Sequence, residues 1–160
     1  MASWLDVEQG APRIAQAGRS RLDQARVALL GTLREDGSPR ISPVEPYFTH
    51  GQLIFGVMTW SGKARDLRRD PRCVLHTTLS GPDAGEPELK LYGLAAAASD
   101  PLREACQQAW WLREPRPAAD VYLLDMTEAV LIEWDLERGQ MTGTHWSSSR
   151  GLRQQARTYP

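Results

Sequence analysis

Ser61, Gly62 and Lys63 are residues whose types and spacing suit the binding of a phosphate group. They follow a hydrophobic run and precede a short polar segment, the pattern expected where a strand gives way to a helix capped by Ser61. The free amide groups at a helix start attract anions, and the serine hydroxyl and lysine ammonium would bind the same ligand. Gly62 would let that ligand approach the backbone closely. The segment predicts a local phosphate site, with a helix-surface lysine as the alternative for Lys63.

Further basic residues surround this segment but differ in what they predict. Arg40 opens the preceding strand, so it would converge on the same phosphate if the two strands pair, and a surface arginine beside a turn is the alternative. Arg68 and Arg69 lie a turn or more along the helix and are offset by Asp66 and Asp70, which favours a solvated helix face. We therefore expect one local anion site, not a continuous basic surface.

The composition of the whole chain argues against several classes of protein. Its 160 residues fit a single domain over 1–160, with a helical segment over 1–24 and a C-terminal tail over 147–160. The net charge of −1 gives no general attraction to nucleic acid or to an anionic membrane. The first residues do not form a secretory signal, and no stretch approaches the ~18 apolar residues of a membrane helix. We expect a cytoplasmic protein that binds neither nucleic acid nor membrane.

The histidines and cysteines predict neither a metal site nor a catalytic triad. His50, His76 and His145 lie far apart without helical spacing, and no nucleophile motif accompanies them. Cys73 and Cys106 form no C-x-x-C pair, so both are expected to be small core residues. We therefore predict no metal and nominate no general base or other catalytic side chain.

Hydrophobic runs separated by turn residues predict a mainly β protein. Strands are expected over 25–33, 40–48, 52–59, 73–78, 89–98, 121–126, 129–134 and 141–146. Asp36-Gly37 is a strong hairpin signal, and His50-Gly51 is expected to turn the chain again before the third strand. Pro43 and Pro46 indicate that the second strand is bent, bulged or at an edge. Short strands joined by hairpins predict a small antiparallel barrel, not a doubly wound parallel sheet.

Helices and loops would lie at the periphery of this barrel. A weakly amphipathic helix is expected over 13–24, and a short helix over 63–69 is ended by Pro71. A third helix begins at Asp100 and runs to about 112, followed by a linker over 113–120. Residues 80–87 are rich in proline and glycine and predict a surface loop.

The order of these motifs resembles the split-barrel flavin-binding proteins of the pyridoxamine 5′-phosphate oxidase-like superfamily. The resemblance covers residues 26–153 and follows the segments VALLGTLREDGSPRISPVEPYF, QLIFGVMTWSGKARDLRRDPRCVLHT, ELKLYGLA, DVYLLDMTEAVLIEW and THWSSSRGLR. Its most characteristic pattern is Ser-x-Lys-x-x-x-Leu-x-x-x-Pro, formed by Ser61, Lys63, Leu67 and Pro71. The resemblance implies a split, Greek-key-like β-barrel with peripheral helices. It also implies a homodimer that binds FMN, or a related deazaflavin, in clefts between the two protomers.

The resemblance further implies roles for individual residues of this chain. The flavin would be lined by Arg40, Ser42, Pro43, Val44 and Glu45, with Val57 and Met58 beside its ring. Ser61, Gly62 and Lys63 would hold the phosphate. Apart from the resemblance, Trp60 could also cover the cofactor, and a core or interface position is the alternative for this strand-end aromatic residue. From the second protomer, Glu88, Lys90 and Trp146 would reach across the cofactor.

This sequence differs from the vitamin-B6 oxidases of that superfamily at two places, and both differences bear on which substrate and cofactor it would bind. Those enzymes grip their substrate with a C-terminal Arg-x-His, whereas here His145 follows Gly143 and Thr144. They also place an arginine after the serine, where this chain has Gly62, so the predicted phosphate site is less basic. Oxidation of vitamin-B6 phosphates is therefore not expected, and the choice between FMN and a deazaflavin stays open.

The sequence thus predicts a flavin-dependent oxidoreductase that acts on a small-molecule substrate it does not name. The flavin would carry the hydride chemistry, so that half-reaction needs no catalytic side chain. A non-catalytic protein that binds or stores flavin, deazaflavin or haem on the same fold is the alternative. The Trp110-Trp111 pair is expected to pack its helix onto the barrel or dimer, with a place at the mouth of the site as the alternative. The run Ser147–Arg150 is expected to be a polar tail, with a contact to a phosphate or substrate as the alternative.

Overall fold

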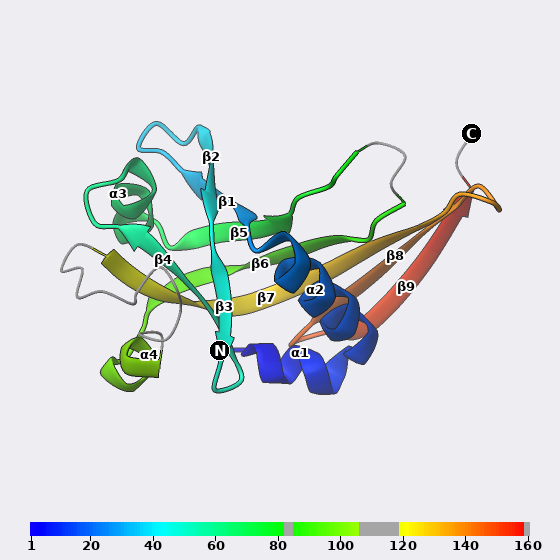
Figure 1. Cartoon of the computed structure of the whole chain (residues 1–160), viewed down its shortest axis with the longest axis horizontal. Helices are drawn as coiled ribbons and strands as arrows, with labels where there is room; N and C mark the ends of the chain where they lie inside the picture. Colours follow the sequence, from blue (N-terminus) through cyan, green and yellow to red (C-terminus); the bar gives the residue numbers. More distant parts are fainter. Residues whose placement is uncertain (82–84, 106–118, 159–160) are drawn as a thin grey trace.

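The chain folds into a twisted antiparallel sheet with helices on its outside (Figure 1). A computed structural model describes residues 1–81, 85–105 and 119–158. The helices are α1 (Trp4–Gly10), α2 (Pro12–Ala25), α3 (Gly62–Arg69) and α4 (Asp100–Ala105). The strands are β1 (Ala28–Leu33), β2 (Pro39–Val44), β3 (Pro46–Thr49), β4 (Gln52–Met58), β5 (Arg72–Thr77), β6 (Glu88–Ala97), β7 (Ala119–Asp135), β8 (Gln140–Ser147) and β9 (Gly151–Thr158).

Strand β7 is the element around which the sheet is organised. The described strands join in the order β2-β1-β5-β6-β7-β4-β3, with β8 paired to β7 and β9 paired to β8. The 17 residues of β7 pair antiparallel with β6, β4 and β8 along their length. Because β2 and β3 form the two ends of the main path, the sheet stays open. This is the mainly β, antiparallel architecture that the sequence predicts.

The predicted strands over 121–126 and 129–134 are one strand, and a β-bulge explains the difference. The register of β6 against β7 shifts between Tyr92 and Gly93, which leaves Thr127 as the extra residue of β7. The Thr127 hydroxyl donates to the Tyr92 carbonyl at 3.2 Å. Gly93 permits the close approach, since a Cβ there would lie 2.2 Å from the Asp125 carbonyl oxygen. The polar residues in the middle therefore mark an irregularity within β7 and not its end.

The strand predicted over 40–48 is two strands, as its prolines suggest. β2 pairs with β1 in the register Ala28↔Val44, whereas β3 pairs with β4 in the register Pro46↔Phe55. The chain therefore changes partner at Glu45, which belongs to neither strand. This change separates the end of β2 from β4 and places the Glu45 side chain at the resulting cleft.

Two predicted turns are confirmed by their backbone geometry. Asp36-Gly37 lies in the β1–β2 hairpin, where Gly37 has φ of 81° and the Ser38 amide and hydroxyl donate to the Asp36 carboxylate. His50 and Gly51 join β3 to β4 with φ of 49° and 70°, so both adopt the left-handed conformation of a tight hairpin turn.

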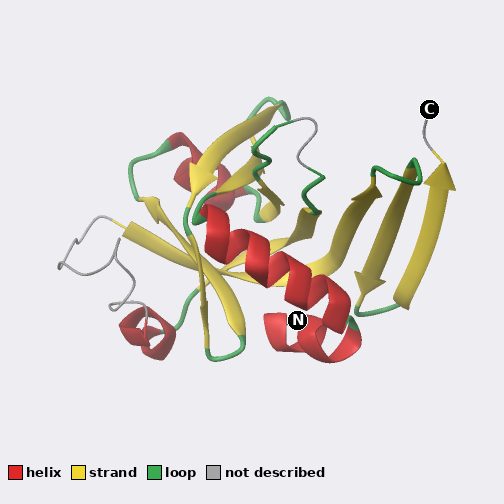
Figure 2. Cartoon of the chain, turned by 45° about the vertical axis from the view of Figure 1, so that its right-hand side comes forward, coloured by secondary structure: helices red, strands yellow, loops and turns green. Residues whose placement is uncertain are grey.

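The helix predicted over 13–24 is confirmed by α2, which lies across β6 and β7 (Figure 2). Ile14 of α2 and Trp4 of the preceding helix α1 are fully buried in the main hydrophobic core. Gly18 lets α2 approach the sheet, because a Cβ there would lie 2.7 Å from Leu89 Cδ2. None of the described helices is long and apolar enough to cross a membrane.

The segment predicted as a C-terminal tail over 147–160 contains the strand β9. β9 pairs with β8 from Ser147↔Gly151 to Gln140↔Thr158, while all eight of its residues are exposed. A strand that buries neither face has no apolar alternation, so the hydrophobic pattern gave no sign of it. Backbone pairing with β8 defines this element.

Several predicted features lie wholly or partly outside the described residues. These are the Trp110-Trp111 pair, Cys106, part of the loop over 80–87, most of the linker over 113–120 and the second half of the helix expected to reach about 112. The first half of that helix is confirmed by α4. Cys73 is buried in the core as predicted, and burial raises the pKa of its thiol to about 12.

Candidate cofactor-binding cleft

A cleft of about 480 Å³ opens between the end of β2, the end of β4 and the start of α3. Eight of the fourteen residues predicted for the site line it: Pro43, Val44, Glu45, Val57, Met58, Trp60, Ser61 and Lys63. Val27, Gly56 and Ala119 complete the lining. The cleft thus brings together the eight predicted residues, Val27 just before β1 and Ala119 at the start of β7.

The floor and rim of the cleft are apolar. Val44 and Val57 are buried, with 4% and 3% of their surface exposed, and belong to the main core. Met58 and Trp60 follow at the rim, where 54% and 71% of their surface is exposed. A buried aliphatic floor beside exposed large side chains suits a flat, largely apolar ring that covers them on binding.

The polar end of the cleft is the first turn of α3, and its geometry confirms the predicted helix cap. Ser61 has an extended backbone, and its hydroxyl accepts a hydrogen bond from the Ala64 amide at 3.3 Å. Lys63, in the first turn, donates from Nζ to the Pro43 carbonyl of β2 at 2.6 Å. The lysine therefore does not extend freely into solvent but lies back over the cleft.

Lys63 and Glu45 influence each other's charge across this cleft. Burial lowers the pKa of the Lys63 ammonium, and the nearby Glu45 carboxylate partly offsets that shift. Burial raises the pKa of Glu45, with Lys63 acting in the opposite direction. Each charged form is therefore under-solvated, so an anionic ligand group beside Lys63 would stabilise its ammonium form.

Arg40 does not line the cleft, but a buried carboxylate holds it directly beside the start of α3. Its Nε donates to Asp66 Oδ2 at 2.6 Å, and the Thr32 hydroxyl donates to the same oxygen at 2.8 Å. Asp66 is only 3% exposed. Burial alone would raise the pKa of Asp66, but these hydrogen bonds and the charges of Arg40 and Arg69 hold it below its ordinary value. Asp66 thus stays ionised and fixes the guanidinium.

Gly62 leaves the space that this guanidinium occupies. A Cβ at position 62 would lie 2.9 Å from both Cζ and Nη1 of Arg40. The sequence predicted that Gly62 lets a ligand approach the backbone, whereas in the structure Arg40 makes the close approach. A guanidinium from β2 therefore lies beside the first turn of α3 together with Lys63, although Asp66 already offsets its charge.

Ser42, Glu88, Lys90 and Trp146 do not line the cleft. The Glu88 carboxylate lies 3.5 Å from the Lys90 ammonium and 3.7 Å from His76 Nε2, and it accepts a hydrogen bond from Trp134 Nε1 at 3.3 Å. This cluster lies on β5, β6 and β7, so a contact with the cofactor would have to come from a second protomer and stays a prediction.

Trp146 lies apart from this cluster. It is only 6% exposed, belongs to the main core and packs against Gly10 of α1. The structure therefore places Trp146 in the core, and its contact with the cofactor of a second protomer stays a prediction. The aromatic residue that contacts Glu88 is Trp134, which lies on β7 two residues after Ile132, the pairing partner of Glu88.

Some residues of the site could not be predicted from the sequence, because contacts between distant segments bring them there. Ala119 reaches the cleft by pairing with Met58, 61 residues earlier in the chain. The sequence predicts that Asp66 offsets the charge of surface arginines, whereas in the structure it is buried. Its place beside Ala64 and Leu67 on the buried side of α3 is the one sequence signal for that burial.

The three histidines occupy separate places, as their spacing in the chain predicts. His76 lies by Glu88, His145 Nδ1 lies 3.3 Å from Glu128, and His50 contacts the Thr49 hydroxyl. Within the described ranges, no group of three or more histidine, cysteine, aspartate or glutamate side chains could hold a metal ion.

Comparison with solved structures identifies the fold around this cleft. A pyridoxamine 5′-phosphate oxidase-related, FMN-binding protein from Nostoc punctiforme PCC 73102 is 18% identical with a TM-score of 0.68, over 99% of this chain and 98% of that protein. PhzG from Burkholderia lata 383, in complex with tetrahydrophenazine-1-carboxylic acid, is 14% identical with a TM-score of 0.69, over 92% and 89%. A haem-binding protein from Mycobacterium smegmatis is 14% identical with a TM-score of 0.59, over 91% and 88%.

The chain therefore has the split β-barrel fold of pyridoxamine 5′-phosphate oxidase-related proteins, and the predicted resemblance is confirmed at the level of the fold. No sequence model of a protein family matches the chain, and no curated protein matches it in sequence. The similar structures are described with different ligands, so the chemistry of this chain has to be argued from its own cleft.

Proposed function

We propose that the chain is a flavin-dependent oxidoreductase that binds FMN in the cleft between β2, β4 and α3. One observation carries the proposal: an apolar cleft ends at a helix start that has an ammonium and a guanidinium beside it. FMN combines a flat, largely apolar ring with a terminal phosphate, and each part matches one end of this cleft. Proteins of this fold include one described as FMN-binding, which supports the same choice.

The side chains of the cleft would position the cofactor and exclude water from it. Val44 and Val57 form a floor for the ring, and Ser61 and Lys63 would bind its phosphate with the amides of the first turn of α3. A bound flavin supplies the hydride chemistry at its N5 atom. Glu45 is the one acidic side chain of the lining, and its raised pKa makes it the group best placed to hold a proton near the ring.

We propose that the functional unit is a homodimer that covers the rim of the cleft. Met58 and Trp60 expose 54% and 71% of their surface at this rim, and Ile41 of β2, two residues before Pro43, exposes 71%. A second copy that covered them would shield both these side chains and a bound ring from water. Glu88 and Lys90 would then act across the interface. Sedimentation equilibrium tests the proposal, which requires a dimer at micromolar concentration and is wrong if the protein is a monomer there.

A deazaflavin relative of FMN is the alternative cofactor, because the same ring floor and phosphate end would accept it. The substrate stays open, since the described lining carries few polar groups that would select one. The absence of an Arg-x-His pattern before Trp146 argues against oxidation of vitamin-B6 phosphates. The expected cytoplasmic location also stays a prediction.

The second candidate is a protein that binds flavin, deazaflavin or haem without turning over a substrate. It is favoured by the scarcity of acid–base groups, because the described lining offers only Glu45 and Lys63 as ionisable side chains. A similar structure is described as a haem-binding protein. The two candidates differ in whether the bound group exchanges electrons with a second molecule.

Absorption spectroscopy and cofactor release separate the candidates. Protein purified from its native host should be yellow, release FMN on denaturation, and bleach when a reduced nicotinamide is added. A flavin that no nicotinamide or other reductant of the cell reduces would support the binding protein, and a Soret band would support haem. Colourless protein that gains no thermal stability from FMN or a deazaflavin would reject both flavin functions.

A further inference from the structure

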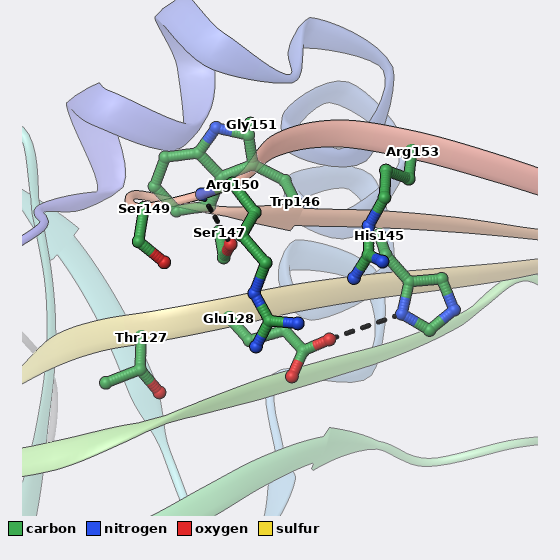
Figure 3. A pocket seen from close by; sticks show the side chains of 9 residues that line it. All are labelled: Thr127, Glu128, His145, Trp146, Ser147, Ser149, Arg150, Gly151 and Arg153. Carbon is green, nitrogen blue, oxygen red and sulfur yellow. Dashed lines mark hydrogen bonds and ion pairs between the residues drawn. The ribbon is translucent and has the colours of Figure 1, made fainter.

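A second candidate binding site lies at the turn between β8 and β9, away from the residues of the cleft. A pocket of about 220 Å³ is formed there by β7, the end of β8, the turn and the start of β9 (Figure 3). It shares no lining residue with the cofactor cleft. The residues that matter are Glu128, His145, Ser147, Ser149, Arg150 and Arg153, which we call the turn pocket.

The sequence Ser147–Gly151 fixes the position of Arg150. The pair Ser147↔Gly151 closes a hairpin around the three residues 148–150. Gly151 has φ of 68°, the left-handed conformation that commonly ends such a three-residue loop. The Ser147 hydroxyl accepts a hydrogen bond from the Arg150 amide at 3.1 Å, which holds the turn closed. The backbone of Arg150 is thus defined although its side chain is exposed.

Strand register places the other charged groups on the same face. His145 pairs with Arg153 of β9, and Ser147 pairs with Glu128 of β7. Side chains at such paired positions lie side by side, and residues two apart along a strand share a face. Figure 3 shows the Arg150 side chain folded back from the turn over β7, and the Arg153 guanidinium directed toward His145.

The charges of the turn pocket are unbalanced. Glu128 is its one carboxylate, and its Oε1 lies 3.3 Å from His145 Nδ1. Neither Arg150 nor Arg153 forms a side-chain ion pair with any described residue, in contrast to Arg13, Arg21, Arg40 and Arg68. Two guanidinium groups therefore share a small pocket with serine hydroxyls and a single carboxylate, and among the described residues neither guanidinium has a carboxylate oxygen within ion-pair distance.

We propose that the turn pocket binds a phosphate group, either as the free ion or as part of a small phosphomonoester. Guanidinium groups match phosphate oxygens with paired N–H donors, and a dianion would neutralise both Arg150 and Arg153. The Ser147 and Ser149 hydroxyls can donate to the same ion. The volume of about 220 Å³ is sufficient for a phosphate with a small organic group. Binding does not depend on the flavin cleft, so this inference stands apart from the proposed function.

Isothermal titration with sodium phosphate at constant ionic strength tests the proposal directly. The titrations use the Lys63→Ala background, so that the start of α3 contributes little phosphate binding. Arg150→Ala and Arg153→Ala should each weaken phosphate binding about tenfold, since each removes charge-assisted hydrogen bonds. Arg138→Ala is the matched control, because Arg138 is an exposed arginine of the β7–β8 turn, at the opposite end of β8 from the pocket, and pairs with Asp135. It should leave the phosphate affinity unchanged.

Backbone amide NMR shifts locate the ion and complete the test. Phosphate should shift the amides of 147–153 in the Lys63→Ala protein, and acetate at the same ionic strength should shift them less. Glycerol 3-phosphate should bind at least as tightly as phosphate if the site serves a phosphomonoester, and more weakly if it serves the free ion. Absence of phosphate binding, or equal loss in Arg150→Ala and Arg138→Ala, would overturn the proposal.

Discussion

The start of α3 and the turn between β8 and β9 both suit a phosphate, but the structure holds their cations in different ways. At α3 the Arg40 guanidinium is fixed by Asp66, which is 3% exposed, and Lys63 is fixed by the Pro43 carbonyl. At the turn Arg150 and Arg153 are exposed, and only their backbone is fixed by the hairpin. Ordering a long exposed side chain costs entropy on binding, whereas a side chain that is already held costs little.

The two sites have similar numbers of positive charges, so that number alone does not determine how tightly a site binds an anion. The site at α3 also borders an apolar floor, which adds ring burial to phosphate binding, while the turn pocket is polar throughout its named residues. We therefore expect tight binding of a large cofactor at α3 and weaker, exchangeable binding of a small ion at the turn. The substitutions below test this difference, from the largest expected effect to the smallest.

Asp66→Asn should have the largest effect. The change leaves Arg40 without its carboxylate in a mostly buried position, so the free energy of unfolding should fall by about 3 kcal/mol. FMN affinity should fall as well, because Arg40 is released from the start of α3. Urea denaturation and FMN titration measure the two effects. Asp70→Asn is the control at the C-cap of the same helix, because Asp70 pairs with the exposed Arg72 and should tolerate the change. Equal stability of both variants would contradict the anchoring role of Asp66.

Lys63→Ala should weaken FMN binding by about 1–3 kcal/mol, the usual loss when a charged hydrogen-bond donor to a ligand is removed. Quenching of flavin fluorescence measures the dissociation constant. Arg65→Ala, two residues further along α3, removes the same charge from an exposed residue outside the cleft and should change the constant little. The phosphate role of Lys63 is wrong if both variants bind FMN as the unsubstituted protein does.

Gly62→Ala separates cofactor binding from stability. The new Cβ would push the Arg40 guanidinium aside while its ion pair with Asp66 can be kept, so the cost to folding should be about 1 kcal/mol, less than in Asp66→Asn, and partly offset by the better helix propensity of alanine. FMN affinity should nevertheless fall, since Arg40 would move from the first turn of α3. Thermal melts with and without FMN measure both. Unchanged FMN stabilisation would show that Arg40 does not contribute to the site.

Glu45→Gln should have the smallest effect, visible as a pH dependence. Because the pKa of Glu45 is raised in the folded state, its ionisation opposes folding as pH rises above the ordinary carboxylate range. The glutamine variant should therefore gain melting temperature relative to the parent protein as the pH rises above about 4. Melting curves in a buffer series measure the difference. A gain that is constant across the series would contradict the raised pKa.

Local signals predicted the elements that position the cleft. The Ser61 cap, the Asp36-Gly37 hairpin and the His50-Gly51 turn each depend on a few adjacent residues, and all three are confirmed. Fourteen cofactor-binding residues were predicted, most of them through the family resemblance, and eight of them line one cleft. Sequence patterns succeeded wherever the physical cause lies within one or two turns of chain.

Contacts between distant segments account for what the sequence did not show. The pairing of Ala119 with Met58, the buried bond of Asp66 with Arg40, and the core position of Trp146 under α1 all join residues far apart in the chain. Strand β9 was missed for a different reason, because its residues are exposed on both faces and carry no hydrophobic period. No local pattern encodes either kind of feature.

The central claim is that the start of α3 binds the phosphate of a flavin, and comparing FMN with riboflavin tests it most directly. Riboflavin has the same ring without the phosphate, so any difference in affinity reports the phosphate end alone. The unsubstituted protein should bind FMN at least about tenfold more tightly than riboflavin, and Lys63→Ala should remove most of that preference. Equal affinity for the two ligands, or a preference that survives in Lys63→Ala, would contradict the account.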